Sequence, residues 1–159
     1  VTPNPHVHAM LANKQNLTLL SDSQILRSWG LDEAAVECLE RSVPRTKIVS
    51  RDDAAELWLT RRQLFFKPVA GHGSKGVYRG SKLTRRVFEN ILDESYIAQT
   101  FIPATERSLK IDDVVTTRKV DIRLYTYGGK LLLPAARVYQ GQVTNFRTSG
   151  GGFAPVFQV

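Results

Sequence analysis

The stretch QLFFKP at residues 63–68 is a short apolar run that ends in a lysine, and the stretch GHGSKG at residues 71–76 follows it closely. The first stretch predicts a β-strand, and residues 77–79 predict the strand that returns from a glycine-rich turn. Glycine reaches backbone angles that other residues avoid, so successive N–H groups of such a turn can point at one anion. The lysines at positions 67 and 75 add positive charge. The pattern therefore predicts a hairpin suited to phosphate, although an ordinary glycine-rich turn fits the same residues when they are taken alone.

Two other phosphate-binding patterns do not fit this stretch. The P-loop requires Gly-Lys followed by Ser or Thr at the start of a helix, and residues 71–76 contain no such triplet. The dinucleotide fingerprint Gly-x-Gly-x-x-Gly matches residues 71–76 by spacing, but a strand is expected where that fingerprint needs a helix. The loop therefore belongs to neither class.

The residues before this hairpin predict helices, and those after it predict mainly strands. Apolar residues recur at helical spacing, with the stretch Ser21-Asp22-Ser23, Asp32 and Asp52 placed to cap or start helices. The expected elements are helices within residues 9–29, from Asp32 to Pro44, from Asp52 to Leu59 and from residue 83 or 84 to Leu92, and strands at residues 46–50, 96–103, 120–127 and 130–139. Residues 104–117 are expected to be a polar connector, residues 128–129 a tight Gly-Gly turn, and residues 140–152 a loop. The pattern predicts an α+β fold with strands joined mainly by hairpins.

The composition is that of a globular protein with an excess of positive charge. The 159 residues are 42% hydrophobic and carry a formal net charge of +7, which attracts polyanions such as nucleotides or nucleic acids. No apolar run approaches the length of a membrane helix, so no membrane partner is expected. The single cysteine, Cys38, cannot form an internal disulfide, and this favours the cytoplasm. Its apolar neighbours on the predicted helix indicate a core position rather than a nucleophile, and packing roles are expected for Trp29 and Trp58.

Five motifs follow one another in the order that is typical of the ATP-grasp superfamily. They are NKQNL at residues 13–17, VPRT at 43–46, FKP at 66–68 with its glycine-rich loop, IAQ at 97–99 and VDIR at 120–123. The first and third motifs, with the residues around them, resemble the circularly permuted ATP-grasp proteins, a group with glutathionylspermidine-synthase-like and carboxylate–amine ligase-like members. The resemblance spans residues 2–156. It implies an ATP-grasp-like fold with mixed or antiparallel sheets, a glycine-rich hairpin and packed helices.

The resemblance also implies three parts of the chain. Residues 1–62 form a helical lead-in that carries the first lysine. Residues 63–103 hold the lysine strand, the glycine-rich loop and the adenine linker, and residues 104–159 form an incomplete C-terminal part of the ATP-grasp core. Because the chain opens in a loop-like stretch at Val1, we expect a fragment whose partner is the missing N-terminal part of the same longer chain.

The implied function is that of the ATP-binding region of an ATP-dependent carboxylate–amine ligase, which forms an amide bond through an acylphosphate. The expected ligands are ATP, Mg²⁺, a carboxylate substrate and an amine acceptor. The nucleotide-binding residues that the resemblance implies are Lys14, Lys67, Gly71, His72, Gly73, Ser74, Lys75, Gly76, Gln99, Thr100, Phe101, Ile102 and Asn145. Arg123, Arg137 or Arg147 would stabilise the transferring phosphoryl group or orient the acceptor carboxylate, because an arginine fork binds two oxygens at once. For each arginine, an exposed charge on a strand is an equally good interpretation.

The sequence offers few candidate ligands for the magnesium ion that the resemblance implies. The family uses carboxylates and a Glu-x-Asn-like element on a late strand, whereas no Asp or Glu follows Gly152. Asp121 is the candidate metal ligand, and the alternation of its strand points it to the same side as Arg123, with which it could form an ion pair instead. Two alternatives therefore stay open: a non-catalytic nucleotide-binding module with an incomplete magnesium site, and a basic nucleic-acid-binding domain, which is the least favoured.

Overall fold

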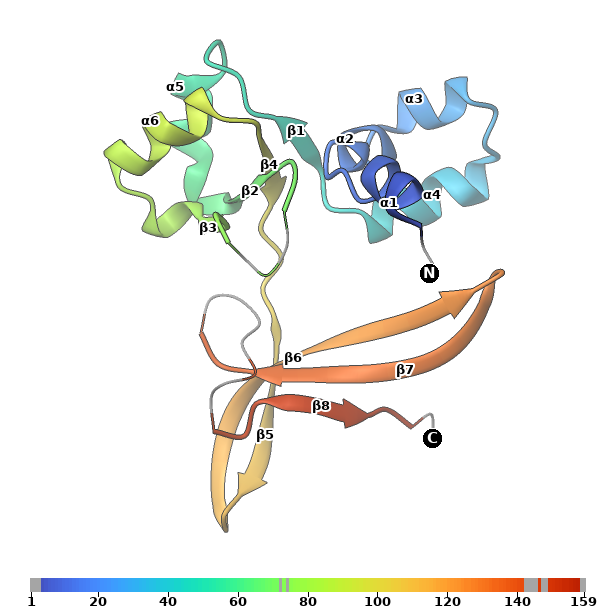
Figure 1. The fold of residues 1–159 in the computed structure, drawn as a ribbon, viewed down its shortest axis with the longest axis vertical. Helices are drawn as coiled ribbons and strands as arrows, with labels where there is room; N and C mark the ends of the chain where they lie inside the picture. The colour runs from blue at the N-terminus through green and yellow to red at the C-terminus, as the bar shows by residue number, and fades with distance from the viewer. Residues whose placement is uncertain (1–3, 72, 74, 142–145, 147–148, 158–159) are drawn as a thin grey trace. The chain divides into compact units, whose positions relative to one another are not determined.

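The computed structural model describes residues 4–71, 73, 75–141, 146 and 149–157. The chain divides into two compact units, Val1–Ile102 and Pro103–Val159, which we call unit 1 and unit 2 (Figure 1). Unit 1 contains helices and a four-stranded antiparallel sheet, and unit 2 contains a second four-stranded antiparallel sheet. The predicted α+β class is confirmed.

The helices of unit 1 are α1 (Pro5–Leu11), α2 (Asn16–Leu20), α3 (Ser23–Ser28), α4 (Glu33–Ser42), α5 (Ala54–Thr60) and α6 (Arg85–Asp93), with short 3-10 helices η1 (Arg61–Gln63) and η2 (Gly80–Lys82). Of these, α1, α3, α4 and α6 start where a short polar side chain accepts a hydrogen bond from the backbone. Asp22 and Asp32 cap α3 and α4 as predicted. The predicted cap at Asp52 is wrong, because the Asp52 N–H donates to the Ser50 hydroxyl in a turn and α5 begins only at Ala54.

Two further predictions about side chains in the helices are wrong. Cys38 is exposed, since Val36 is the buried residue of α4 and a residue two positions further along a helix faces nearly the opposite way. Trp29 at the end of α3 is 54% exposed. Trp58 packs as expected, with its ring centroid 5.2 Å from that of Phe88.

The sheet of unit 1 has the strand order β1-β4-β2-β3, with all neighbours antiparallel. Its strands are β1 (Thr46–Ile48), β2 (Leu64–Pro68), β3 (Tyr78–Arg79) and β4 (Tyr96–Thr100). One face packs against α5 and α6 in a core whose buried members are Leu57, Phe66, Phe88, Ile91, Tyr96 and Ala98. Because neighbouring residues on a strand face opposite ways, Lys67 and Gln99 lie on the other face.

The sheet of unit 2 has the strand order β5-β6-β7-β8 and is also antiparallel throughout. Its strands are β5 (Thr105–Ile111), β6 (Val114–Tyr127), β7 (Lys130–Tyr139) and β8 (Gly152–Pro155). The long β6–β7 hairpin turns at Gly128 and Gly129, both at positive φ, as predicted.

The predicted polar connector at residues 104–117 is wrong. These residues form β5 and the beginning of β6, and the turn between the strands is made by Asp112 and Asp113 at φ 48° and 63°. Aspartate tolerates this left-handed conformation, although glycine and asparagine are the usual signals for it. Since the strands are largely polar and exposed, neither an apolar pattern nor a glycine marks the hairpin in the sequence.

Candidate functional site

Two lysines from distant parts of the sequence converge at the start of the glycine-rich turn. Lys67 lies near the end of β2, and Lys14 lies in the short turn before α2. The Lys14 N–H donates to the Val69 carbonyl at 3.1 Å, and its Nζ donates to the Gly71 carbonyl at 2.9 Å. These two bonds connect Lys14 to the backbone segment that follows β2, the strand that contains Lys67.

The electrostatic environment of the Lys67 ammonium disfavours its charge. Its burial lowers its pKa from the usual 10.5, and the nearby charge of Lys14 lowers that pKa further. In the part of the chain that the structure describes, no carboxylate lies within ion-pair distance of either ammonium group. Two adjacent positive charges without an acidic partner form a site that favours an anion.

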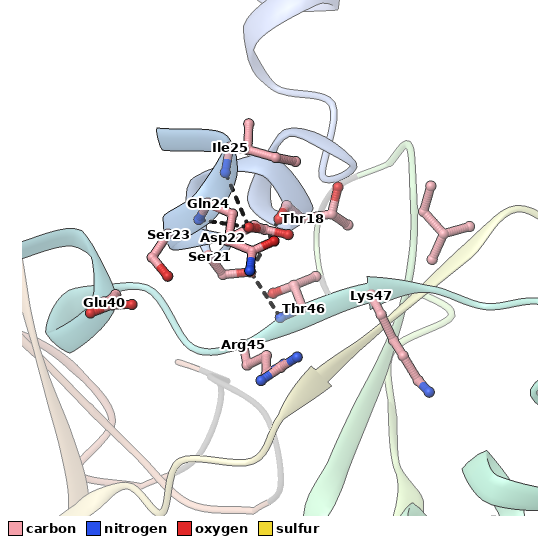
Figure 2. Close-up of a pocket in the computed structure, with 11 residues that line it drawn as sticks. Thr18, Ser21, Asp22, Ser23, Gln24, Ile25, Glu40, Arg45, Thr46 and Lys47 are labelled. Atoms are coloured by element: carbon pink, nitrogen blue, oxygen red, sulfur yellow. Dashed lines mark hydrogen bonds between the residues drawn. The ribbon is translucent and has the colours of Figure 1, made fainter. Parts of the chain in front are cut away.

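A chain of hydrogen bonds runs behind Lys67 across the sheet. The Lys67 Nζ donates to Gln99 Oε1 at 2.5 Å, Gln99 Nε2 donates to the Thr46 hydroxyl at 2.9 Å, and that hydroxyl donates to the Pro44 carbonyl at 2.8 Å. The Thr46 N–H donates to the Ser21 hydroxyl at 3.0 Å (Figure 2). The register places Thr46 directly opposite Gln99, so that both side chains share the face of Lys67.

The glycine-rich turn has the backbone geometry that its sequence predicts. Gly71, Gly73 and Gly76 have φ values of 111°, 68° and 66°, which other residues rarely adopt. A Cβ at Gly76 would lie 2.8 Å from the Tyr96 hydroxyl oxygen, so this position also needs glycine for space. Lys75 is exposed, and His72 and Ser74, which are also predicted to bind phosphate, lie outside the described residues.

The predicted adenine linker is partly engaged within unit 1. The Thr100 N–H donates to the Arg45 carbonyl at 2.9 Å, and the Phe101 N–H donates to the Gln63 carbonyl at 2.8 Å. The Phe101 ring lies 4.3 Å below the Arg79 guanidinium, on the face of the sheet that carries Lys67. Ile102 is 62% exposed. These two N–H groups are therefore occupied in this structure, and the Phe101 ring itself packs against the Phe65 ring, with 5.5 Å between the centroids.

A cavity of about 630 Å³ adjoins the far end of the hydrogen-bond chain. It lies between the α2–α3 turn and β1, and Ser21, Asp22, Thr46 and Lys47 are among its lining residues (Figure 2). The sequence does not predict these residues as part of a site. The signal for Thr46 was its place in the VPRT motif, where the short strand β1 begins.

Unit 2 carries the remaining predicted residues. Arg137 holds Asp121 with two parallel bonds, from Nε to Oδ1 at 2.5 Å and from Nη2 to Oδ2 at 2.9 Å. The register places these residues directly opposite each other on β6 and β7, which explains why the ion pair involves Arg137 rather than Arg123. The Arg123 guanidinium lies 5.9 Å from the Tyr125 ring centroid. Asn145 and Arg147 lie outside the described residues.

Unit 2 contains a buried arginine that its sequence does not predict. Arg118 on β6 is 8% exposed, and its Nε and Nη2 atoms donate to the Ser149 carbonyl at 3.3 and 3.0 Å. It therefore ties β6 to the segment just before β8. An arginine among polar strand residues gives no signal of burial, so the sequence could not have identified it.

Neither a metal centre nor a membrane span is found among the described residues. No three His, Cys, Asp or Glu side chains gather there in a group that could hold a metal ion. No helix of this part of the chain is both long and apolar enough to cross a membrane. Asp121 stays the predicted magnesium ligand, now with an arginine as its neighbour.

Comparison of the chain with models of protein families, with curated proteins and with solved structures finds no match. The functional interpretation therefore depends on the geometry of the chain itself.

Proposed function

We propose that unit 1 binds the phosphates of ATP and belongs to the ATP-binding region of an ATP-dependent carboxylate–amine ligase of the ATP-grasp type. The observation that carries this proposal is the convergence of Lys14 and Lys67 at the glycine-rich turn, without a carboxylate in ion-pair distance among the described residues. An anion that binds here removes the repulsion between the two ammonium groups, and it also compensates the burial of Lys67.

Each part of the site has a role that suits a polyphosphate. A lysine ammonium has three N–H donors, and Lys67 and Lys14 each use one of them in bonds to the described residues. In the turn, Gly71, Gly73 and Gly76 carry no side chain, so an anion can approach their backbone closely. Phosphoryl transfer is mainly a matter of positioning and charge neutralisation, so cations and backbone donors are the groups that it needs.

The catalytic half of the proposal concerns unit 2. Arg123, Arg137 and Arg147 would bind the transferring phosphoryl group or the substrate carboxylate, and Asp121 with Asn145 would hold Mg²⁺. The Asp121–Arg137 pair favours a second candidate, a nucleotide-binding module that does not complete the reaction, because a carboxylate that is engaged by an arginine must give up part of that contact to bind a metal.

Calorimetric titration of the chain with ATP, with and without Mg²⁺, tests the proposal. Replacing Lys14 or Lys67 by alanine should weaken ATP binding by roughly 10- to 100-fold, because each change removes charge-assisted hydrogen bonds to phosphate. Lys82→Ala is the matched control, since Lys82 is an exposed lysine in η2. Equal losses in all three variants, or no binding by the unaltered chain, would reject the phosphate site. Binding that does not respond to Mg²⁺ would favour the non-catalytic module.

A further inference from the structure

The hydrogen-bond chain behind Lys67 is built from buried, uncharged side chains. Gln99 and Thr46 are each 6% exposed, although neither belongs to an apolar residue type. Buried polar groups cost free energy unless all their hydrogen bonds are made, and here they are connected in series. A sheet face that needed only packing would carry apolar residues at both positions, so this arrangement calls for a functional explanation.

The direction of each bond in the chain is fixed by its far end. The Thr46 hydroxyl has one hydrogen, which it donates to the Pro44 carbonyl, so towards Gln99 it can only accept. The amide NH₂ of Gln99 must therefore face Thr46, and its oxygen must face Lys67. A flipped amide would place NH₂ against the ammonium and lose both bonds.

The uncharged character of the acceptor is as important as its orientation. A carboxylate at position 99 would form an ion pair with Lys67 and neutralise the charge that a phosphate needs. The amide oxygen holds the ammonium by a hydrogen bond and leaves its net charge in place. Among the described residues, the charged group that acts on Lys67 from another element is Lys14, which disfavours protonation. The amide oxygen of Gln99 is a contact that favours the charged form of Lys67.

We propose that Gln99 and Thr46 are positioning residues, which orient the Lys67 ammonium towards the phosphates of ATP and keep it available as an uncompensated cation. This inference depends on the proposed function of unit 1. The α2–α3 turn holds the backbone of Thr46 in place, because the Ser21 hydroxyl accepts a hydrogen bond from the Thr46 N–H at the wall of the cavity (Figure 2). Neither residue needs to touch the nucleotide through its side chain.

Three variants separate this role from a merely structural one. Thr46→Val keeps the shape of the side chain but removes the hydroxyl, whereas Thr46→Ser keeps the hydroxyl. Gln99→Glu keeps the shape of the amide and adds a negative charge. Thermal unfolding of each variant confirms that it is folded before binding is compared.

Two readouts are measured for every variant: the affinity for ATP by calorimetry as a function of pH, and the pKa of Lys67 by NMR titration without ATP. Thr46→Val should weaken ATP binding by roughly 3- to 10-fold, which corresponds to the loss of one oriented hydrogen bond. It should also lower the pKa of Lys67, and Thr46→Ser should restore both properties. Gln99→Glu should raise the pKa of Lys67 and yet weaken ATP binding, a combination that damage to the fold would not produce.

The outcomes distinguish failure of the inference from failure of the proposed function. If the unaltered chain binds ATP through Lys67 but Thr46→Val and Gln99→Glu bind it equally well, the positioning role is rejected and the phosphate site remains. If the unaltered protein does not bind ATP, the proposed function fails. The role of Gln99 and Thr46 in orienting Lys67 towards phosphate then fails with it. An unchanged pKa of Lys67 in both Thr46→Val and Gln99→Glu would reject the hydrogen-bond chain itself in either case.

Discussion

The two sheets have the same number of strands and the same antiparallel pairing, but they differ in what covers them. The sheet of unit 1 packs one face against α5 and α6 around Phe66 and Phe88, which are fully buried. The sheet of unit 2 exposes large apolar side chains along both strands of its longest hairpin. These exposed residues on β6 and β7 are Val114, Val115, Ile122, Leu124, Tyr125, Tyr127, Leu131, Leu132 and Leu133.

The exposure beyond Val120 accompanies a change in strand pairing. In unit 2, β5 pairs with β6 only up to Val120, and β8 pairs with β7 only from Ala135 to Val138. Among the described residues, the rest of the β6–β7 hairpin is a ribbon of two strands with no further strand paired to either edge, and such a ribbon is marginally stable by itself. The lysine site of unit 1 is therefore supported by a buried apolar core. Arg123 and Arg137 of unit 2 lie on a sheet that gains much less stability from burial of apolar side chains.

The largest expected difference between the units concerns their apolar side chains. Phe66→Ala should lower the free energy of unfolding of unit 1 by about 3–5 kcal/mol, because it leaves a cavity beside Phe88. Leu124→Ala, at a position that is 61% exposed, should change the unfolding free energy by less than about 0.5 kcal/mol. Urea unfolding measures both, with the fluorescence of Trp58 as the reporter for unit 1. A large loss in Leu124→Ala would show that the ribbon is covered in solution and would remove the contrast.

The glycines of the two units provide the next test. A Cβ on Gly80 would lie 1.8 Å from the Arg61 carbonyl oxygen, which is backbone and cannot move aside cheaply. Gly80→Ala should therefore destabilise unit 1 by about 1–3 kcal/mol. Gly128 at the tip of the ribbon has open space around it and a φ of 55°, so Gly128→Ala should cost about 1 kcal/mol through its backbone angle alone. Thermal unfolding compares the two, and equal losses would mean that space at η2 is not limiting.

How far the sequence predicts the molecule differs between the units for a physical reason. In unit 1 the signals are local and agree with one another: Asp22 and Asp32 cap helices, and residues 63–68 are an apolar strand next to glycines. The pairing of Lys67 with Gln99 was not predicted, because a contact across 32 residues depends on the register of β2 and β4. In unit 2 the Asp112–Asp113 turn and the burial of Arg118 carry no local signal, and the partner of Asp121 is set by the register of β6 and β7.

A smaller effect is expected from the ion pair in unit 2. Asp121 and Arg137 form a two-point contact with side chains that are 30% and 25% exposed, so a double-mutant cycle with Asp121→Asn and Arg137→Gln should give a coupling of about 0.5–1 kcal/mol. Lys130→Gln is the matched control on the same sheet, because Lys130 pairs with Tyr127 at the far end of the hairpin, and its coupling to Asp121 should be close to zero. If added Mg²⁺ abolishes the Asp121–Arg137 coupling, Asp121 binds the metal in preference to the arginine.

The smallest expected effect is a pH dependence that marks Lys67 as a functional rather than a structural residue. Its pKa in the folded chain lies below the usual 10.5, so between these two values Lys67 binds more protons in the unfolded chain, and its contribution to the free energy of unfolding of unit 1 rises with pH. Below the folded-state pKa the penalty for burying the charge is present in full. Lys67→Met should remove the rise, whereas Lys82→Met should leave it unchanged; urea unfolding at a series of pH values measures both.

The same lysine is then expected to act on stability and on binding in opposite directions. The charge that lowers the stability of unit 1 near neutral pH is the charge that the proposed phosphate site needs, whereas in unit 2 the charge of Arg137 is already compensated by Asp121. Loss of the pH-dependent rise together with loss of ATP binding in Lys67→Met would therefore separate a site kept ready for an anion from an ion pair that supports a sheet. If the free energy of unfolding of Lys67→Met still rises with pH, the pH dependence belongs to another group. Lys67 would then not differ from Arg137 as an uncompensated charge.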